Sequence, residues 1–158
     1  MRSAHMFKAA VAVAACSLAL PTAADASTIT CVGTTTLGPP ASYTSSGGGD
    51  ALVERLEITG MHDLCLADGT VVSAAITGTL LQVTHPDHGT GHVVVNETLS
   101  VMGGTVEANV RARFGPEGFD ATVHVYGGTG TLEGMSGRGT TFPTGEGTFF
   151  SQIDYQYR

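Results

Sequence analysis

Two glutamates stand on strand faces that are otherwise apolar. Glu54 interrupts the leucine and isoleucine face of an expected strand at Ala51–Thr59, and Glu97 interrupts the valine and leucine face of an expected strand at His92–Met102. A carboxylate is costly to bury without a partner or a proton. If these faces line a lumen, Glu54 and Glu97 are candidate catalytic residues that act as general acid or base. Otherwise each lies near a strand end or pairs with an arginine.

A polar strand face supplies two further candidates. In the expected strand Phe119–Tyr126, the residues Asp120, Thr122, His124 and Tyr126 share one face. If that face lines a polar lumen, His124 and Tyr126 are candidate ligand-binding residues. An exterior face is the other interpretation.

A polar turn carries the residue types that bind metals. His85, Asp87, His88 and His92 could hold zinc or copper if the turn folded back on itself. Histidine-rich polar turns more often cap a hairpin, so we expect no metal site. The sequence also shows no nucleophile motif, because the segment around Ser136 lacks the spacing of a nucleophile elbow. We also expect no cofactor.

The chain begins like an exported protein. Arg2 and Lys8 form a basic region, Ala9–Leu20 is apolar but short, and Ala24-Asp25-Ala26 fits a small-residue cleavage site. We expect a signal peptide at 1–26, one domain at 27–158, no membrane span and a secreted product. A lipid anchor on Cys16 is the alternative, because the residues before it resemble a lipobox.

Charge and cysteine content limit the partners. The chain has 14 acidic and 7 basic residues, and its only lysine lies in the expected leader. An acidic, lysine-free surface argues against binding to nucleic acid or to an anionic membrane. Beyond the leader, Cys31 and Cys65 remain, and in an exported chain they are expected to form a disulfide. Two buried free thiols are the alternative.

Alternation without helical periodicity predicts an all-β domain. About eight antiparallel strands at short spacing favour a single up-and-down barrel, with a two-sheet sandwich as the alternative. We expect Gly38–Gly49 to be a flexible loop and Gly60–Leu66 to lead into a turn at 67–69. The expected strands are Ser27–Leu37, Ala51–Thr59, Thr70–Thr84 with a bend at Gly78, His92–Met102, Thr105–Phe114, Phe119–Tyr126 and Thr148–Tyr157, with a return strand that includes Thr140–Phe142.

The glycines between the strands near 126 and 140 predict a tight corner with one turn at Leu132–Met135. This segment, G-G-T-G-T-L-E-G-M-S-G-R-G from Gly127 to Gly139, resembles the G-G-[ST]-G-x-[FL]-x-G-x-x-G-x-G segment of the allene oxide cyclase-like barrels, which the dirigent proteins share. The ending Gly147–Tyr157 is similar to the final strand of bacterial members. The resemblance covers Val123–Tyr157 and concerns a structural motif.

The resemblance implies an eight-stranded barrel that binds a small hydrophobic molecule, and in some relatives steers its cyclisation. It makes a cofactor-independent cyclase or isomerase one hypothesis, in which Glu54 and Glu97 polarise or deprotonate the substrate. No catalytic motif of the family can be matched residue by residue. A non-catalytic binding module and a structural protein with a filled core are the alternatives. The family also implies a possible dimer or trimer.

Overall fold

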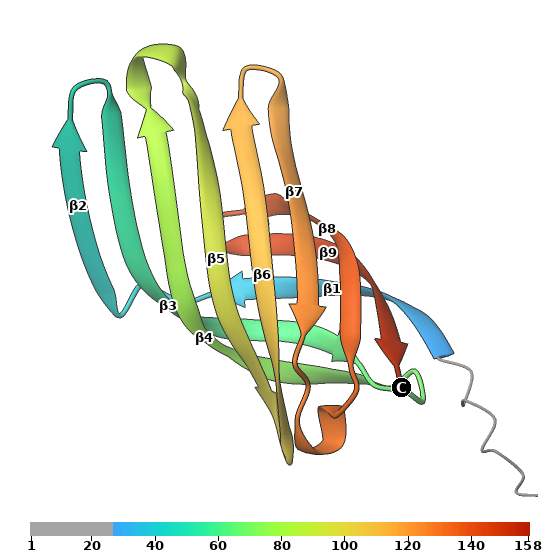
Figure 1. The fold of residues 1–158 in the computed structure, drawn as a ribbon. Helices are drawn as coiled ribbons and strands as arrows, with labels where there is room; N and C mark the ends of the chain where they lie inside the picture. Colours follow the sequence, from blue (N-terminus) through green and yellow to red (C-terminus); the bar gives the residue numbers. More distant parts are fainter. Residues whose placement is uncertain (1–26) are drawn as a thin grey trace, which may run out of the picture.

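The computed structural model describes residues 27–158, so the expected leader at 1–26 and the alternative anchor at Cys16 lie outside the described residues. The described chain forms nine antiparallel strands and two short 3₁₀ turns (Figure 1). In chain order these elements are β1 (Ser27–Leu37), β2 (Ser42–Gly48), β3 (Ala51–Cys65), β4 (Val71–His85), η1 (Pro86–His88), β5 (Thr90–Val101), β6 (Gly104–Gly115), β7 (Gly118–Tyr126), η2 (Gly130–Leu132), β8 (Ser136–Gly145) and β9 (Thr148–Tyr157).

Eight of the strands close an up-and-down barrel. From β3 to β9 each strand pairs with the next along the chain, and β1 lies between β9 and β3. The predicted all-β barrel is therefore confirmed, and β2 is an additional strand outside the closed ring. Closure pairs every barrel strand on both sides over at least part of its length, which removes most of the free sheet edge.

One edge of β3 pairs with two different strands. Its first half pairs with β2, whereas Gly60–His62 pair with Thr35–Leu37 of β1 and close the ring. Two expectations are thereby corrected. Gly38–Gly49 is not all loop, because residues 42–48 form β2 along the free edge of β3. The strand predicted at Ala51–Thr59 does not stop there, because it passes through Gly60 and continues to Cys65.

A disulfide holds the short seam between β1 and β3. Cys31 and Cys65 are bonded, with their Cα atoms 5.7 Å apart, which confirms the predicted pairing. Beside it, the backbone N–H and the hydroxyl of Thr34 both donate to Asp63 Oδ2 at 3.0 Å. Because only three residue pairs join β1 to β3, these side-chain links extend the seam beyond the backbone ladder.

The glycine corner closes one end of the barrel. Gly130 has a φ of +58°, and a Cβ there would lie 1.9 Å from the carbonyl oxygen of Gly103, so no other residue fits. The adjacent Thr131 N–H donates to that same oxygen at 3.0 Å. This docking places the single turn η2 slightly earlier than predicted and buries Leu132 and Met135 completely in the barrel base.

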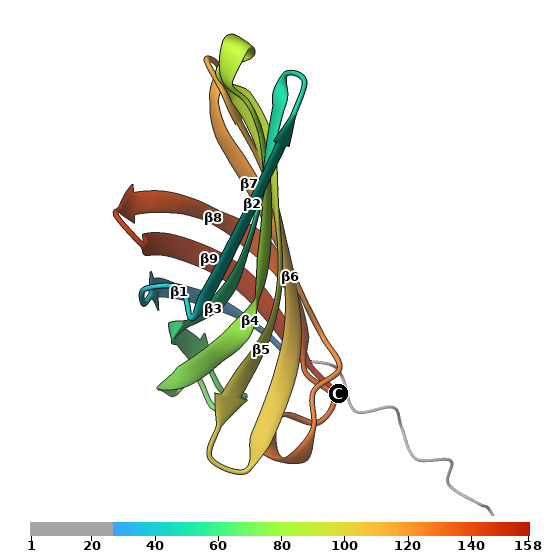
Figure 2. The same ribbon diagram turned by 90° about the vertical axis from the view of Figure 1, so that its left-hand side faces the viewer.

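The opposite end of the barrel flares. β2 to β7 extend past the ring as a tall sheet, while β8, β9 and β1 swing away from it (Figure 2). The divergence occurs between β7 and β8, where only Thr122–Val125 pair with Gly137–Thr140. The remaining half of each strand has no partner on that side, so the barrel opens at this end.

Replacing both Cys31 and Cys65 by serine should destabilise the barrel while preserving its strands. The bond joins residues 34 positions apart, and a loop of that size restricts the unfolded chain by about 4 kcal/mol. We expect the free energy of unfolding in urea to fall by about 3 kcal/mol. In reductant, the free energy of unfolding of wild type should equal that of the double variant. Equal stability of oxidised and reduced wild type would show that the seam does not depend on the bond.

Candidate ligand-binding cavity

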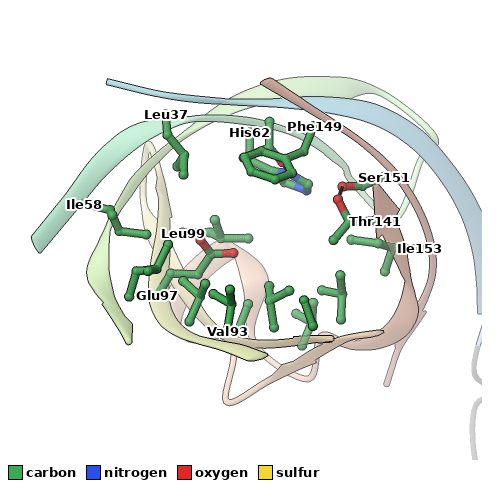
Figure 3. A pocket seen from close by; sticks show the side chains of 18 of the residues that line it. Leu37, Ile58, His62, Val93, Glu97, Leu99, Thr141, Phe149, Ser151 and Ile153 are labelled. Carbon is green, nitrogen blue, oxygen red and sulfur yellow. Dashed lines mark hydrogen bonds between the residues drawn. The ribbon is translucent and has the colours of Figure 1, made fainter. Parts of the chain in front are cut away.

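The barrel contains a cavity of about 390 Å³ on the flared side of its base. All eight ring strands contribute to its wall, which is mainly valine, leucine, isoleucine, alanine and phenylalanine (Figure 3). Its mouth is lined by Leu37, Phe114, Phe119 and Phe149, which lie next to the turns at the open end. Its floor is the packed base around Leu132. Such a space is large enough for a small organic molecule.

Glu97 extends from β5 into this cavity (Figure 3). It stands between Val95 and Leu99 on the inner face, opposite Gly78 of β4 and Ala108 of β6. A Cβ at Gly78 would lie 2.7 Å from the Cα of Glu97, so the glycine allows the two strands to approach. Burial raises the pKa of the Glu97 carboxyl to about 7. The group is therefore largely protonated in weakly acidic solution.

His62 forms a hydrogen-bonded chain on another part of the wall. Its Nδ1 lies 2.7 Å from Thr35 Oγ1 and its Nε2 lies 3.2 Å from the hydroxyl of Tyr155. Burial lowers the pKa of His62 to about 4, a shift only partly offset by the charge of Asp63. The ring is thus neutral over the pH range in which Glu97 is protonated. Burial also raises the pKa of Tyr155.

The burial of Tyr155 decides the tautomer of His62. Tyr155 is fully buried, and a buried hydroxyl hydrogen needs an acceptor. His62 Nε2 is the partner of this hydroxyl, so the tautomer that satisfies it has an unprotonated Nε2 and a hydrogen on Nδ1. The Nδ1–H then donates to Thr35 Oγ1.

Three further polar side chains of the wall donate hydrogen bonds to groups of the protein. Ser151 Oγ donates to Thr141 Oγ1 at 3.0 Å, and Thr141 Oγ1 donates to the carbonyl oxygen of Phe150 at 3.1 Å. Gln82 Nε2 donates to Glu54 Oε2 at 3.3 Å and to Thr84 Oγ1 at 3.2 Å. These contacts leave Glu97 and the hydroxyl hydrogen of Thr35 as the polar groups of the wall without a partner within the protein.

The two predicted catalytic carboxylates are separated by the fold. Glu97 lines the cavity, whereas Glu54 does not. Glu54 lies on the inner face of β3 nearer the flared end, where it accepts hydrogen bonds from Tyr43 Oη at 2.5 Å and from Gln82 Nε2. The Tyr43 partner comes from β2, the strand that had been expected to be loop.

His124 and Tyr126 lie on the outside of the barrel. Their neighbours Val123 and Val125 fill the inner face of β7, so His124 is exposed and Tyr126 retains 47% of its accessible surface. Together with Arg138 they border a surface depression over β7, β8 and β9. Of the two interpretations of this face, the exterior one describes their position.

The histidine-rich turn forms η1 and the start of β5. Within residues 27–158 no three histidine, cysteine, aspartate or glutamate side chains gather closely enough to hold a metal ion. In the same part of the chain, no helix has the length and apolar character needed to cross a membrane.

Sequence reasoning missed His62, Thr35, Thr141 and Ser151 as wall residues. A signal for His62 was present, because the alternation of Glu54 and Ile58 continues through Gly60 to position 62. Ending the strand at Thr59 removed it from consideration. No comparable signal marks the other three, which are ordinary strand residues until the ring closes.

Comparisons with known proteins support the fold. No protein-family model and no curated protein matches the sequence. A crystal structure of a protein of unknown function from the DUF3224 family of Shewanella oneidensis is similar, with a TM-score of 0.63 and 14% sequence identity. The match covers 84% of this chain and 98% of that one. A likeness at this identity concerns the barrel alone and carries no chemistry. The resemblance to allene oxide cyclase-like barrels stays a prediction.

Replacing Glu97 by glutamine should stabilise the protein in a pH-dependent manner. The folded-state pKa of Glu97 is about 7, above the ordinary glutamate value of 4.5, so wild type loses stability as pH rises between these values. We expect the glutamine variant to unfold at higher urea than wild type at pH 8, with a much smaller difference at pH 5. Glu57→Gln, at an exposed position of β3, controls for loss of one negative charge. A pH-independent difference would contradict burial of the Glu97 carboxyl.

His62 should remain neutral well below the usual range for histidine. Its folded-state pKa is about 4 against the ordinary histidine value of 6.5, so its contribution to stability is present above 6.5 and is lost as pH falls through 4. Nitrogen-15 NMR of the ring should show the Nδ1–H tautomer at pH 6, with protonation only near pH 4. A ring that titrates near 6.5 would contradict the buried Thr35–His62–Tyr155 chain.

Proposed function

We propose that the protein binds a small hydrophobic molecule in the barrel, outside the cytoplasm. The observation that carries this proposal is the cavity of about 390 Å³, whose wall is mainly apolar and is built from all eight strands of the ring. An apolar space of this kind gains free energy when it exchanges water for an apolar ligand. The same cavity argues against a structural protein with a filled core.

The electrostatics of the wall favour an uncharged ligand. Below pH 7 Glu97 is mostly protonated and above pH 4 His62 is mostly neutral, so no full charge faces the cavity in weakly acidic solution. Export is supported by the disulfide between Cys31 and Cys65, which suits an oxidising compartment.

A cofactor-independent cyclase or isomerase is the second candidate function. It is favoured by one arrangement, the carboxyl of Glu97 on the wall of an apolar cavity. A carboxyl whose pKa lies near 7 can serve as an acid when protonated and as a base when ionised near neutral pH. Recovering a bound ligand chemically unchanged after prolonged incubation favours a carrier, whereas a product isomeric with the ligand favours the enzyme.

The binding proposal can be tested with the neutral fluorescent probe N-phenylnaphthylamine. We expect its fluorescence to rise on titration with the protein, because the cavity excludes water from the bound probe. Val110→Phe places a ring in the cavity from β6 and should weaken probe binding by about tenfold, through lost space worth about 1.4 kcal/mol.

Thr122→Phe is the matched control, because it adds the same ring on the exposed face of the neighbouring strand β7. Both variants should first be shown to unfold cooperatively. Equal loss of probe binding in the two variants would place the probe on the outer surface. Absence of any binding by wild type would refute the proposed function.

A further inference from the structure

The hydrogen bonds of the cavity wall show which polar side chains still have a hydrogen to donate. Six lining residues carry polar side chains, namely Thr35, His62, Gln82, Glu97, Thr141 and Ser151. A ligand with a polar group must bond to one of them or leave that group unpaired, which costs as much as the bond would contribute. The hydrogens that already donate to groups of the protein therefore show which side chains remain able to bind a polar group of the ligand.

Three of the six have no hydrogen to offer. The amide of Gln82 has two N–H groups, and both of its contacts as a donor are made within the protein. The hydroxyls of Ser151 and Thr141 each have one hydrogen, and both are used in the relay that ends on the carbonyl oxygen of Phe150. A ligand that replaced one of these hydrogen bonds with its own would gain no net free energy.

The His62 chain leaves one hydrogen free at its Thr35 end. With Tyr155 donating to Nε2 and Nδ1–H donating to Thr35, both nitrogens of His62 are occupied. The hydroxyl hydrogen of Thr35 is then the spare one. Thr35 already accepts a hydrogen bond, so its oxygen is fixed in the seam beside His62.

Glu97 differs from all of these groups. The cause of its displaced pKa is burial alone, with no hydrogen bond contributing, and its carboxyl points into the open space of the cavity (Figure 3). Its neighbours across the strands, Gly78 and Ala108, offer no polar side chain. Among the wall residues, His62 is the other titratable group, and it is neutral; Tyr155, near enough to sense a charge on Glu97, is neutral too.

We propose that the cavity selects neutral apolar molecules that carry one hydrogen-bond-accepting group, such as a ketone, aldehyde or ester, and that the protonated carboxyl of Glu97 donates to that group. The inference rests on the proposed function and specifies its ligand class. A protonated carboxyl provides one donor, which a carbonyl oxygen satisfies. A carboxylate ligand of the same size is disfavoured, because its charge would be desolvated without a cationic partner on the wall.

The test uses three ligands of equal chain length: octane, methyl hexyl ketone and octanoate. Each competes with N-phenylnaphthylamine for the full chain at pH 6, where Glu97 is mainly protonated. We expect the ketone to bind about tenfold more tightly than octane, since one hydrogen bond in a dry site is worth about that factor. Octanoate should bind least tightly of the three.

Two substitutions of Glu97 test whether its carboxyl causes the preference for the ketone. Glu97→Leu removes the donor and should lower the affinity of the ketone to that of octane or below it, because its carbonyl is then unpaired. Glu97→Gln keeps an N–H donor and should keep most of the preference. Thr35→Val is the comparison, because it removes the only other free hydrogen of the wall. We expect it to leave the preference for the ketone in place.

The outcomes separate this inference from the proposed function. If the probe binds but octane and the ketone compete equally, or if octanoate competes best, the ligand class is wrong while binding in the cavity stands. If Thr35→Val abolishes the preference and Glu97→Leu does not, the donor is wrongly assigned. If the probe does not bind at all, both proposals fail.

Discussion

The short seam between β1 and β3 determines both the closure of the barrel and the polarity of its interior. Thr35 and His62 are paired residues of that seam, and their side chains are joined to each other and to Tyr155 of β9. Three strands that meet at the closure are thus linked by one neutral imidazole. The disulfide from Cys31 to Cys65 keeps the same strands together where their backbone pairing ends. If the seam opened, His62 would regain water, and its pKa would rise toward the ordinary histidine value.

Burial in this interior shifts the pKa values of two titratable groups in opposite directions. Burial raises the pKa of Glu97 and lowers that of His62, because in both cases the uncharged form is favoured. The protein therefore gives up stability on both sides of a weakly acidic optimum, above it through Glu97 and below it through His62. His62 is compensated by two hydrogen bonds, which makes it part of the structure. Glu97 has no such compensation, so it is the residue whose presence calls for a functional explanation.

Alternation in the sequence predicts the face on which a side chain lies, but not its height along the barrel. Glu54 and Glu97 satisfy the same pattern, yet only Glu97 reaches the cavity, because the register of β3 against β4 sets Glu54 beside Gln82 nearer the flared end. The strand β2 was missed for a different reason. Residues 42–48 are exposed throughout and rich in serine and glycine, so their strand conformation comes from pairing with the edge of β3 and not from local preference. The cysteine pair, most strands and the glycine corner were predictable, because each depends on residue type and spacing along the chain.

The cavity is closed at one end of the barrel and open at the flared end. The base is filled by Leu132, Met135 and Tyr155, while the opposite end opens between β7 and β8. A ligand can therefore extend only toward the flare. Leu99, on the base side of Glu97, is fully buried, whereas Val95 and Val93 continue the inner face of β5 toward the phenylalanines of the mouth. A polar group held by Glu97 would thus lie deep in the barrel, with its apolar part directed outward. This arrangement places the hydrogen bond where water is scarcest, which is where it discriminates most strongly between a carbonyl and a hydrocarbon.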